Sequence, residues 1–165
     1  MRKVLHLSVA MALLGVIVSA QSRSASPATL QGVWRVVEVR TTGPNASTNS
    51  SPQPGLYIFT AKHYSFLRVT ADKPRPDQPQ DPEKANSAEL MAAWGPFFAN
   101  SGTYELSDRT LTIRPLVAQN PRAMRSGSSP TFSYKIEGDT LWLTDESGIR
   151  GPIANPTTVK LARAE

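Results

Sequence analysis

The sequence predicts an all-β domain of about eight antiparallel strands, arranged as a meander or a closed barrel. One observation is that apolar and β-branched residues alternate with polar ones in short segments bounded by Gly, Pro, Asn and Asp, a period of two that is typical of half-buried strands. The other is that most of these segments follow one another across short connections. Consecutive hairpins of this kind favour an up-and-down arrangement of strands.

The expected strands can be placed from this alternation. Ala61-Lys62 and Gly138-Asp139 each separate two such segments and are predicted to be hairpin turns. The strands are expected at residues 32–40, 55–60, 63–70, 102–106, 110–116, 131–137, 140–145 and 157–163.

Two regions interrupt the strand pattern. Residues 41–55 contain Ser, Asn, Thr, Pro and Gly at nearly every position, so a mobile loop is expected there. Residues 71–82 contain several prolines and predict a stiff linker. A helix is then expected over residues 83–94, with Asp81 as its cap and Gly95-Pro96 as its stop. A single helix inserted between hairpins is expected to cover or plug an open end of the barrel.

The N-terminal segment has the order of a secretory signal peptide. Two basic residues, Arg2 and Lys3, precede an apolar run and the small-residue triplet Val18-Ser19-Ala20, which predicts cleavage near Ala20. The alternative is a retained transmembrane anchor, which would require a longer apolar stretch and different flanks. We expect residues 21–29 to be an N-terminal tail and residues 30–165 to form one domain that is periplasmic or secreted, with no transmembrane segment in the mature chain.

Composition excludes several functions. The formal net charge is +5, two of the basic residues belong to the expected signal peptide, and the remaining charges are scattered, so no nucleic-acid partner is expected. The chain has no Cys, and His63 is the one histidine after the signal peptide. A dedicated zinc or iron site is therefore not expected. No phosphate loop, dinucleotide fingerprint or nucleophile elbow occurs either, so neither a cofactor nor a catalytic residue is assigned.

Aromatic residues recur along the strands and are candidates for the lining of a barrel cavity, since such barrels hold either packed side chains or one small ligand. The alternative is that these residues are ordinary core aromatics. Two strand arginines could anchor an acidic head group if they point inward, and otherwise they are solvated charges on the outer face. The complete candidate lining is Tyr57, Phe59, Tyr64, Phe66, Arg68, Tyr104, Arg114, Phe132, Tyr134 and Trp142.

An ordered set of motifs connects the chain to a known family. The segments are Gly-x-Trp at Gly32 to Trp34, "PGLYIFTAKHYSFLRV", "EKANSAELMAAW", "SGTYELSDRTLTI", "EGDTLWLTD" and "TVKLAR". In this order they resemble the bacterial lipocalin-like domain. The resemblance spans nearly all of residues 30–163 and departs from the family pattern at Arg114, where members often have histidine.

The resemblance implies an antiparallel, eight-stranded, lipocalin-like up-and-down β-barrel with one helix between its third and fourth strands. It also implies that Gly32, Trp34 and Arg163 form a structural barrel floor, in which an arginine of the last strand packs on the tryptophan ring by a cation–π contact. Lys160 is the alternative cation. Trp34 is thus expected to close one end of the barrel, and a ligand site is expected at the other end.

The function expected from the sequence is binding of a small, predominantly hydrophobic or acidic lipid-like molecule by an exported protein that is a monomer or weak dimer. One alternative is an enzyme of the cyclase, isomerase or dehydratase type that acts on a hydrophobic substrate in the same barrel. Another is a filled barrel that serves as a protein-interaction module. The fold alone does not choose among these functions.

Overall fold

The computed structural model describes residues 30–165, and the expected signal peptide and N-terminal tail lie outside the described residues. Strands dominate the described part, with one α-helix and one short 3-10 helix. The elements in chain order are β1 (Gly32–Thr41), β2 (Ser47–Asn49), β3 (Gly55–Phe59), β4 (His63–Val69), α2 (Ser87–Trp94), β5 (Phe97–Ser107), β6 (Thr110–Ala118), η1 (Pro121–Met124), β7 (Thr131–Glu137), β8 (Thr140–Gly148), β9 (Gly151–Pro152) and β10 (Thr157–Arg163).

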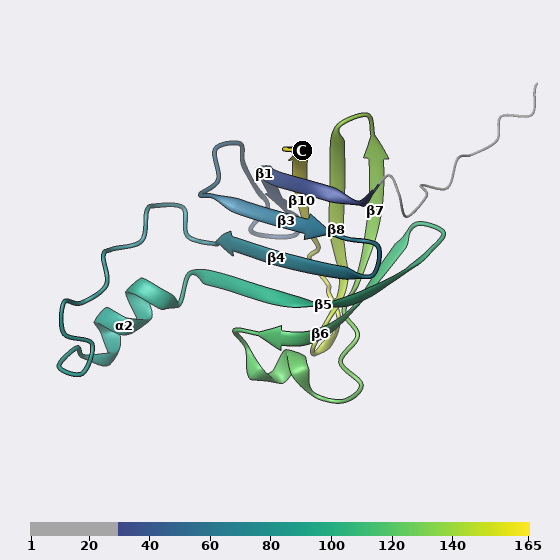
Figure 1. Cartoon of the computed structure of the whole chain (residues 1–165). Helices are drawn as coiled ribbons and strands as arrows, with labels where there is room; N and C mark the ends of the chain where they lie inside the picture. The colour runs from purple at the N-terminus through teal and green to yellow at the C-terminus, as the bar shows by residue number, and fades with distance from the viewer. Residues whose placement is uncertain (1–29) are drawn as a thin grey trace, which may run out of the picture.

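Eight of these strands form a closed antiparallel barrel (Figure 1). They follow the order β10, β1, β3, β4, β5, β6, β7, β8, and β10 closes the ring by pairing with both β1 and β8. The short β2 and β9 pair at the margins, with β1 and β8. The predicted fold class is confirmed, with the one α-helix between the third and fourth barrel strands.

Several strand boundaries differ from those expected. The strands at 131–137 and 157–163 have the predicted bounds, but β5 begins at Phe97 rather than at residue 102. Its first residues pair along the whole of β4, with Val69 opposite Phe97, so a partner strand overrides a weak local pattern. The Ser- and Asn-rich loop likewise contains β2, because the chain turns back after Thr41 and Ser47–Asn49 pair with the end of β1, with Ser47 opposite Thr41 and Asn49 opposite Val39.

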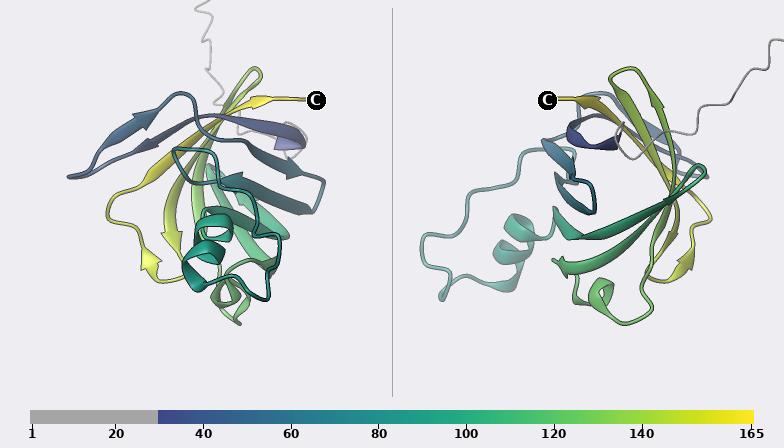
Figure 2. Two further views of the ribbon diagram at one scale, coloured as in Figure 1. Left: turned by 90° about the vertical axis from the view of Figure 1, so that its left-hand side faces the viewer. Right: turned by 45° about the vertical axis from the view of Figure 1, so that its right-hand side comes forward.

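Helix α2 is shorter than expected and does not plug the barrel. It begins after Asn86, whose side chain accepts from the backbone N–H of Glu89 while the Glu89 carboxylate accepts from the Asn86 N–H. This capping box replaces the expected cap at Asp81. Ala93 is the one buried residue of α2, and the helix stands beside the strands (Figures 1 and 2).

The two ends of the barrel differ because of their connections. Short turns link β3 to β4, β5 to β6 and β7 to β8 at one end, whereas the connections at residues 42–54, 70–96, 119–130 and 149–156 lie at the other. The end with the short turns is filled by side chains that are fully buried, among them Leu30, Trp34, Leu141 and Leu161. Any opening of the barrel is therefore confined to the end with the long connections.

The floor of the barrel is built around Trp34. Its indole N–H donates to the Leu30 carbonyl at 2.8 Å, and the Arg163 guanidinium lies 4.1 Å from the ring centroid. Arg163 also donates to the Gln31 carbonyl at 2.9 Å. Gly32 has φ of 129°, and a Cβ there would lie 2.6 Å from Arg163 Nη1, so glycine permits both the backbone turn and the close approach of the arginine.

Candidate functional site

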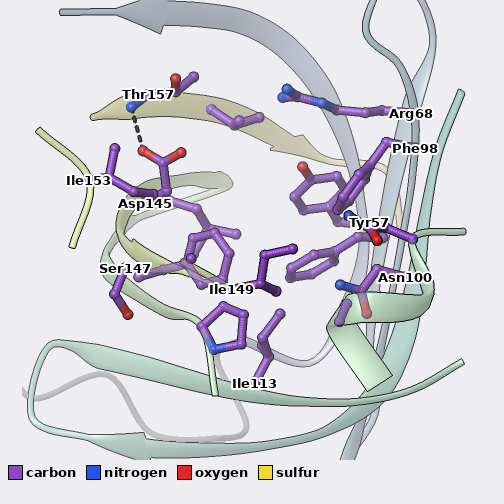
Figure 3. A pocket seen from close by; sticks show the side chains of 18 residues that line it. Tyr57, Arg68, Phe98, Asn100, Ile113, Asp145, Ser147, Ile149, Ile153 and Thr157 are labelled. Atoms are coloured by element: carbon purple, nitrogen blue, oxygen red, sulfur yellow. Dashed lines mark hydrogen bonds between the residues drawn. The ribbon is translucent and has the colours of Figure 1, made fainter. Parts of the chain in front are cut away.

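A cavity of about 280 Å³ lies inside the end of the barrel that has the long connections. It is near the lower limit of ligand pockets, roughly 300 to 1,000 Å³. Its walls are mostly apolar, with a few polar groups on opposite sides (Figure 3). The lining residues are Tyr57, Phe66, Arg68, Phe98, Asn100, Ile113, Asn120, Ala123, Pro130, Phe132, Leu143, Asp145, Ser147, Gly148, Ile149, Ile153, Thr157 and Val159.

Arg68 is the cation of this cavity. It is on the inward face of β4, two residues after Phe66, and its side chain extends over the cavity (Figure 3). Its Nη1 atom is buried and has no hydrogen-bond partner among residues 30–165. A buried donor without an acceptor costs free energy, so an acceptor on a bound molecule would relieve this cost.

Tyr57 lies beside Arg68 on the neighbouring strand β3 and faces the same cavity. Its ring stacks on Phe66 with centroids 4.1 Å apart. Burial raises the pKa of the Tyr57 hydroxyl, and the nearby Arg68 guanidinium partly opposes the shift. The hydroxyl therefore stays protonated at neutral pH and supplies a second polar group next to the arginine.

Asp145 faces the cavity from β8, on the other side from Arg68 (Figure 3). One of its carboxylate oxygens accepts from the backbone N–H of Thr157. Burial raises the pKa of the Asp145 carboxyl, and the Thr157 N–H and Arg68 oppose that shift. Within the described chain no ion pair joins Asp145 to Arg68, so the opposite charges face a shared space without contact.

The raised pKa of Asp145 has a consequence for folding stability. The folded protein retains the Asp145 proton at a pH where the unfolded chain, with a carboxyl pKa of about 3.9, has lost it. Stability therefore falls as the pH rises between those two pKa values. We expect Asp145→Asn, which keeps an oxygen for the Thr157 N–H, to lessen this fall in urea unfolding measured from about pH 4 to pH 7. Parallel stability curves for wild type and variant would contradict this expectation.

Of the ten residues predicted to line the cavity, the structure places four there: Tyr57, Phe66, Arg68 and Phe132. Four others point inward but are buried core, nearer the closed end or beneath the cavity: Phe59, Tyr64, Tyr104 and Tyr134. The hydroxyls of Tyr104 and Tyr134 donate to the backbone carbonyls of Thr60 and Asp108, at the turns of the closed end. Tyr64 donates to Asn100 Oδ1 at 2.6 Å and so orients a residue of the cavity wall.

The remaining two predicted residues lie on the outside of the barrel. Arg114 is exposed and forms an ion pair with Glu105 of β5, with 3.1 Å between Nη2 and Oε2. Trp142 alternates with the inward Leu141 and Leu143 and packs between Lys135 and Lys160, whose Nζ atoms are 5.4 and 5.9 Å from its ring. Neither side chain reaches the cavity, because both occupy the outward parity of their strands.

Asp145 is the functional candidate that sequence reasoning missed. It is the last residue of the strand expected at 140–145, where a carboxylate is typically solvated, but β8 continues to Gly148. Asp145 then falls on the same inward face as Leu141 and Leu143. The signal that could have found it is this shared face with two leucines, a residue type that is among the most often buried. Asn120, Ile149 and Ile153 belong to the long connections, and their place in the cavity wall could not be predicted. Loop residues lack the hydrophobic periodicity that indicates which side chains face inward.

No group of three or more His, Cys, Asp or Glu side chains in residues 30–165 could hold a metal ion. No helix in that part of the chain is both long and apolar enough to cross a membrane. The barrel interior is not completely filled by side chains, because this cavity is present.

Together, the fold and the cavity define an antiparallel β-barrel that is closed at one end and hollow at the other. The family model described as a lipocalin-like domain matches residues 31–155. The chain belongs to this lipocalin-like family. A search of the curated proteins found no match. Among solved structures, an uncharacterized protein from Bacteroides eggerthii matches with 11% identity and a TM-score of 0.42, over 80% of this chain and 98% of that one.

Proposed function

We propose that this protein binds a small, predominantly apolar molecule that has an acidic group. The observation that supports the proposal is the buried Arg68 Nη1, which has no hydrogen-bond partner in the described chain and lies at the edge of an apolar cavity. A carboxylate is the acceptor that matches a guanidinium best, since the charge-assisted bond can be bidentate. The apolar part of the ligand would lie against Phe66, Ile113 and Phe132.

The proposal includes export and a monomeric or weakly dimeric state. The basic residues, apolar run and Val18-Ser19-Ala20 triplet of the first twenty residues support export. N-terminal sequencing of protein recovered outside the cytoplasm, with cleavage near Ala20, is the corresponding measurement.

Binding of decanoate and of decanol, measured by calorimetry at neutral pH, tests the ligand class. The two molecules have the same chain length, and decanoate alone has the negative charge. We expect decanoate to bind about tenfold or more tightly, because a hydrogen bond to a charged group contributes about 1.5–3 kcal/mol. Equal affinities would refute the proposal that the ligand has an acidic group. Failure of both molecules to bind would refute the proposal that the cavity takes an apolar ligand of this size.

Asp145 supports a second candidate function, catalysis on a hydrophobic substrate. Its second carboxylate oxygen faces an apolar cavity, and its raised pKa is suited to proton transfer. Native mass spectrometry and chromatography of co-purifying molecules distinguish the two functions. A carrier releases the molecule that it bound, whereas an enzyme would convert it and an Asp145→Asn variant would retain it unchanged.

A further inference from the structure

Exposed apolar side chains are concentrated at the open end of the barrel. Eight large hydrophobic side chains are exposed in residues 30–165, and six of them belong to α2, the end of β6, η1 or the loop after β8. The most exposed are Val117 at 69%, Met91 at 66% and Leu116 at 62%. We call these six residues the rim: Met91, Trp94, Leu116, Val117, Met124 and Ile149. The other two, Leu56 and Leu67, lie opposite each other on the outer wall formed by β3 and β4.

The rim segments are adjacent to one another and to the cavity. The Gln119 side chain donates to the Trp94 carbonyl at 3.4 Å, which joins the end of α2 to the end of β6. Ile149 lines the cavity together with Asn120 and Ala123, which are the cap and a residue of η1. The rim therefore borders the opening, with α2 and η1 on the same side of the molecule (Figure 2).

Three exposed arginines lie among the rim residues. Arg122, Arg125 and Arg150 line one surface hollow together with Ile149. None of the three forms an ion pair within the described chain. The Glu89 carboxylate on α2 accepts from the backbone at the start of that helix, and Asp145 faces the interior. The surface beside the opening thus combines unpaired guanidinium groups with exposed apolar side chains.

We propose that the rim docks on an anionic lipid bilayer, with the cavity opening toward the membrane. Tryptophan and aliphatic side chains insert at the boundary between headgroups and acyl chains. Guanidinium groups bind lipid phosphates and are attracted by the negative surface potential of the bilayer. A protein partner gives no reason for the charges of this surface to be only positive. An anionic membrane matches both the arginines and the exposed apolar side chains. The docking surface does not depend on the ligand proposed above.

Flotation with vesicles tests the proposal on the whole protein. We expect binding to vesicles of phosphatidylglycerol and phosphatidylcholine, weaker binding to phosphatidylcholine alone, and loss of binding as salt is raised. Leu116→Ser/Val117→Ser and Arg122→Gln/Arg125→Gln should each weaken the partition about tenfold or more. Matched controls on the outer wall, Leu56→Ser/Leu67→Ser and Arg114→Gln, should partition as wild type does.

Quenching of tryptophan fluorescence gives a second test of membrane docking, in which no rim residue is substituted. In a Trp142→Phe variant, brominated lipids should quench the exposed Trp94 and not the buried Trp34. The proposal is overturned if anionic and neutral vesicles bind equally, if the rim variants bind as the controls do, or if Trp94 is not quenched. It is also overturned if sedimentation shows that the rim is occupied by a second copy of the chain and that the resulting dimer does not bind vesicles.

Discussion

Replacement of Trp34 by alanine is expected to lower the free energy of unfolding by about 3–5 kcal/mol. The side chain is fully buried, its N–H bonds to the Leu30 carbonyl, and Arg163 covers its ring. Truncation would leave a cavity at the closed end, an unpaired carbonyl and an arginine without its aromatic partner. Total stabilities of domains are only about 5–15 kcal/mol, so this variant should lose a large part of its stability in urea unfolding.

Trp142→Ala is the matched control for this prediction. Trp142 lies on the outer face between Lys135 and Lys160, so its removal should cost only about 1 kcal/mol. The folded fraction of Trp34→Ala should keep the preference for decanoate over decanol, because Trp34 does not line the cavity that contains Arg68. Similar stability losses in the two variants, or loss of that preference with full stability, would show that Trp34 is not a structural plug.

Replacement of Arg68 by methionine is expected to weaken decanoate binding by roughly tenfold to a hundredfold and to leave decanol binding nearly unchanged. Methionine keeps an apolar stem of similar length, so the cavity wall is retained while the guanidinium is removed. The lost hydrogen bond to a charged group contributes about 1.5–3 kcal/mol, which converts to this change in Kd. Calorimetry with both molecules measures the two effects separately.

Arg114→Met is the matched control, since Arg114 is also a strand arginine but lies outside, paired with Glu105. It should leave both affinities at their wild-type values. An equal loss of decanoate binding in the two variants would indicate a general effect of net charge rather than a contact in the cavity. A decanoate affinity that survives in Arg68→Met would remove Arg68 from the proposed site.

The sequence predicted the strands because most of them have one face in the core and one outside. In β4 and β7 this alternation is visible in the residues themselves, and the expected bounds are close to those observed. The Gly32, Trp34 and Arg163 set was proposed from motif positions, and the structure places the three residues together. The first residues of β5 were missed because their strand conformation depends on pairing with β4.

The site was less accessible to sequence reasoning than the fold was. Alternation groups Arg68 with Phe66 and Trp142 with Thr144, but it does not say which group faces inward. Arg68 and Arg114 were therefore equivalent candidates, and the structure separates them because barrel closure assigns inside and outside. The depth of a residue along the barrel also has no local signal, which is why buried aromatics such as Phe59 and Tyr104 could not be distinguished from the cavity wall.

By itself the sequence determined about eight antiparallel strands in consecutive hairpins and one inserted helix, since strand periodicity and turn residues are local properties, and the resemblance to the lipocalin-like family added the closed barrel. Tertiary structure alone decided that Arg68 and Asp145 face one cavity without contact, that α2 stands beside the opening, and that the exposed apolar residues gather around it. These features depend on which segments closure of the ring brings together. Segments far apart in the chain meet only through that closure, and no local pattern encodes the distance between them.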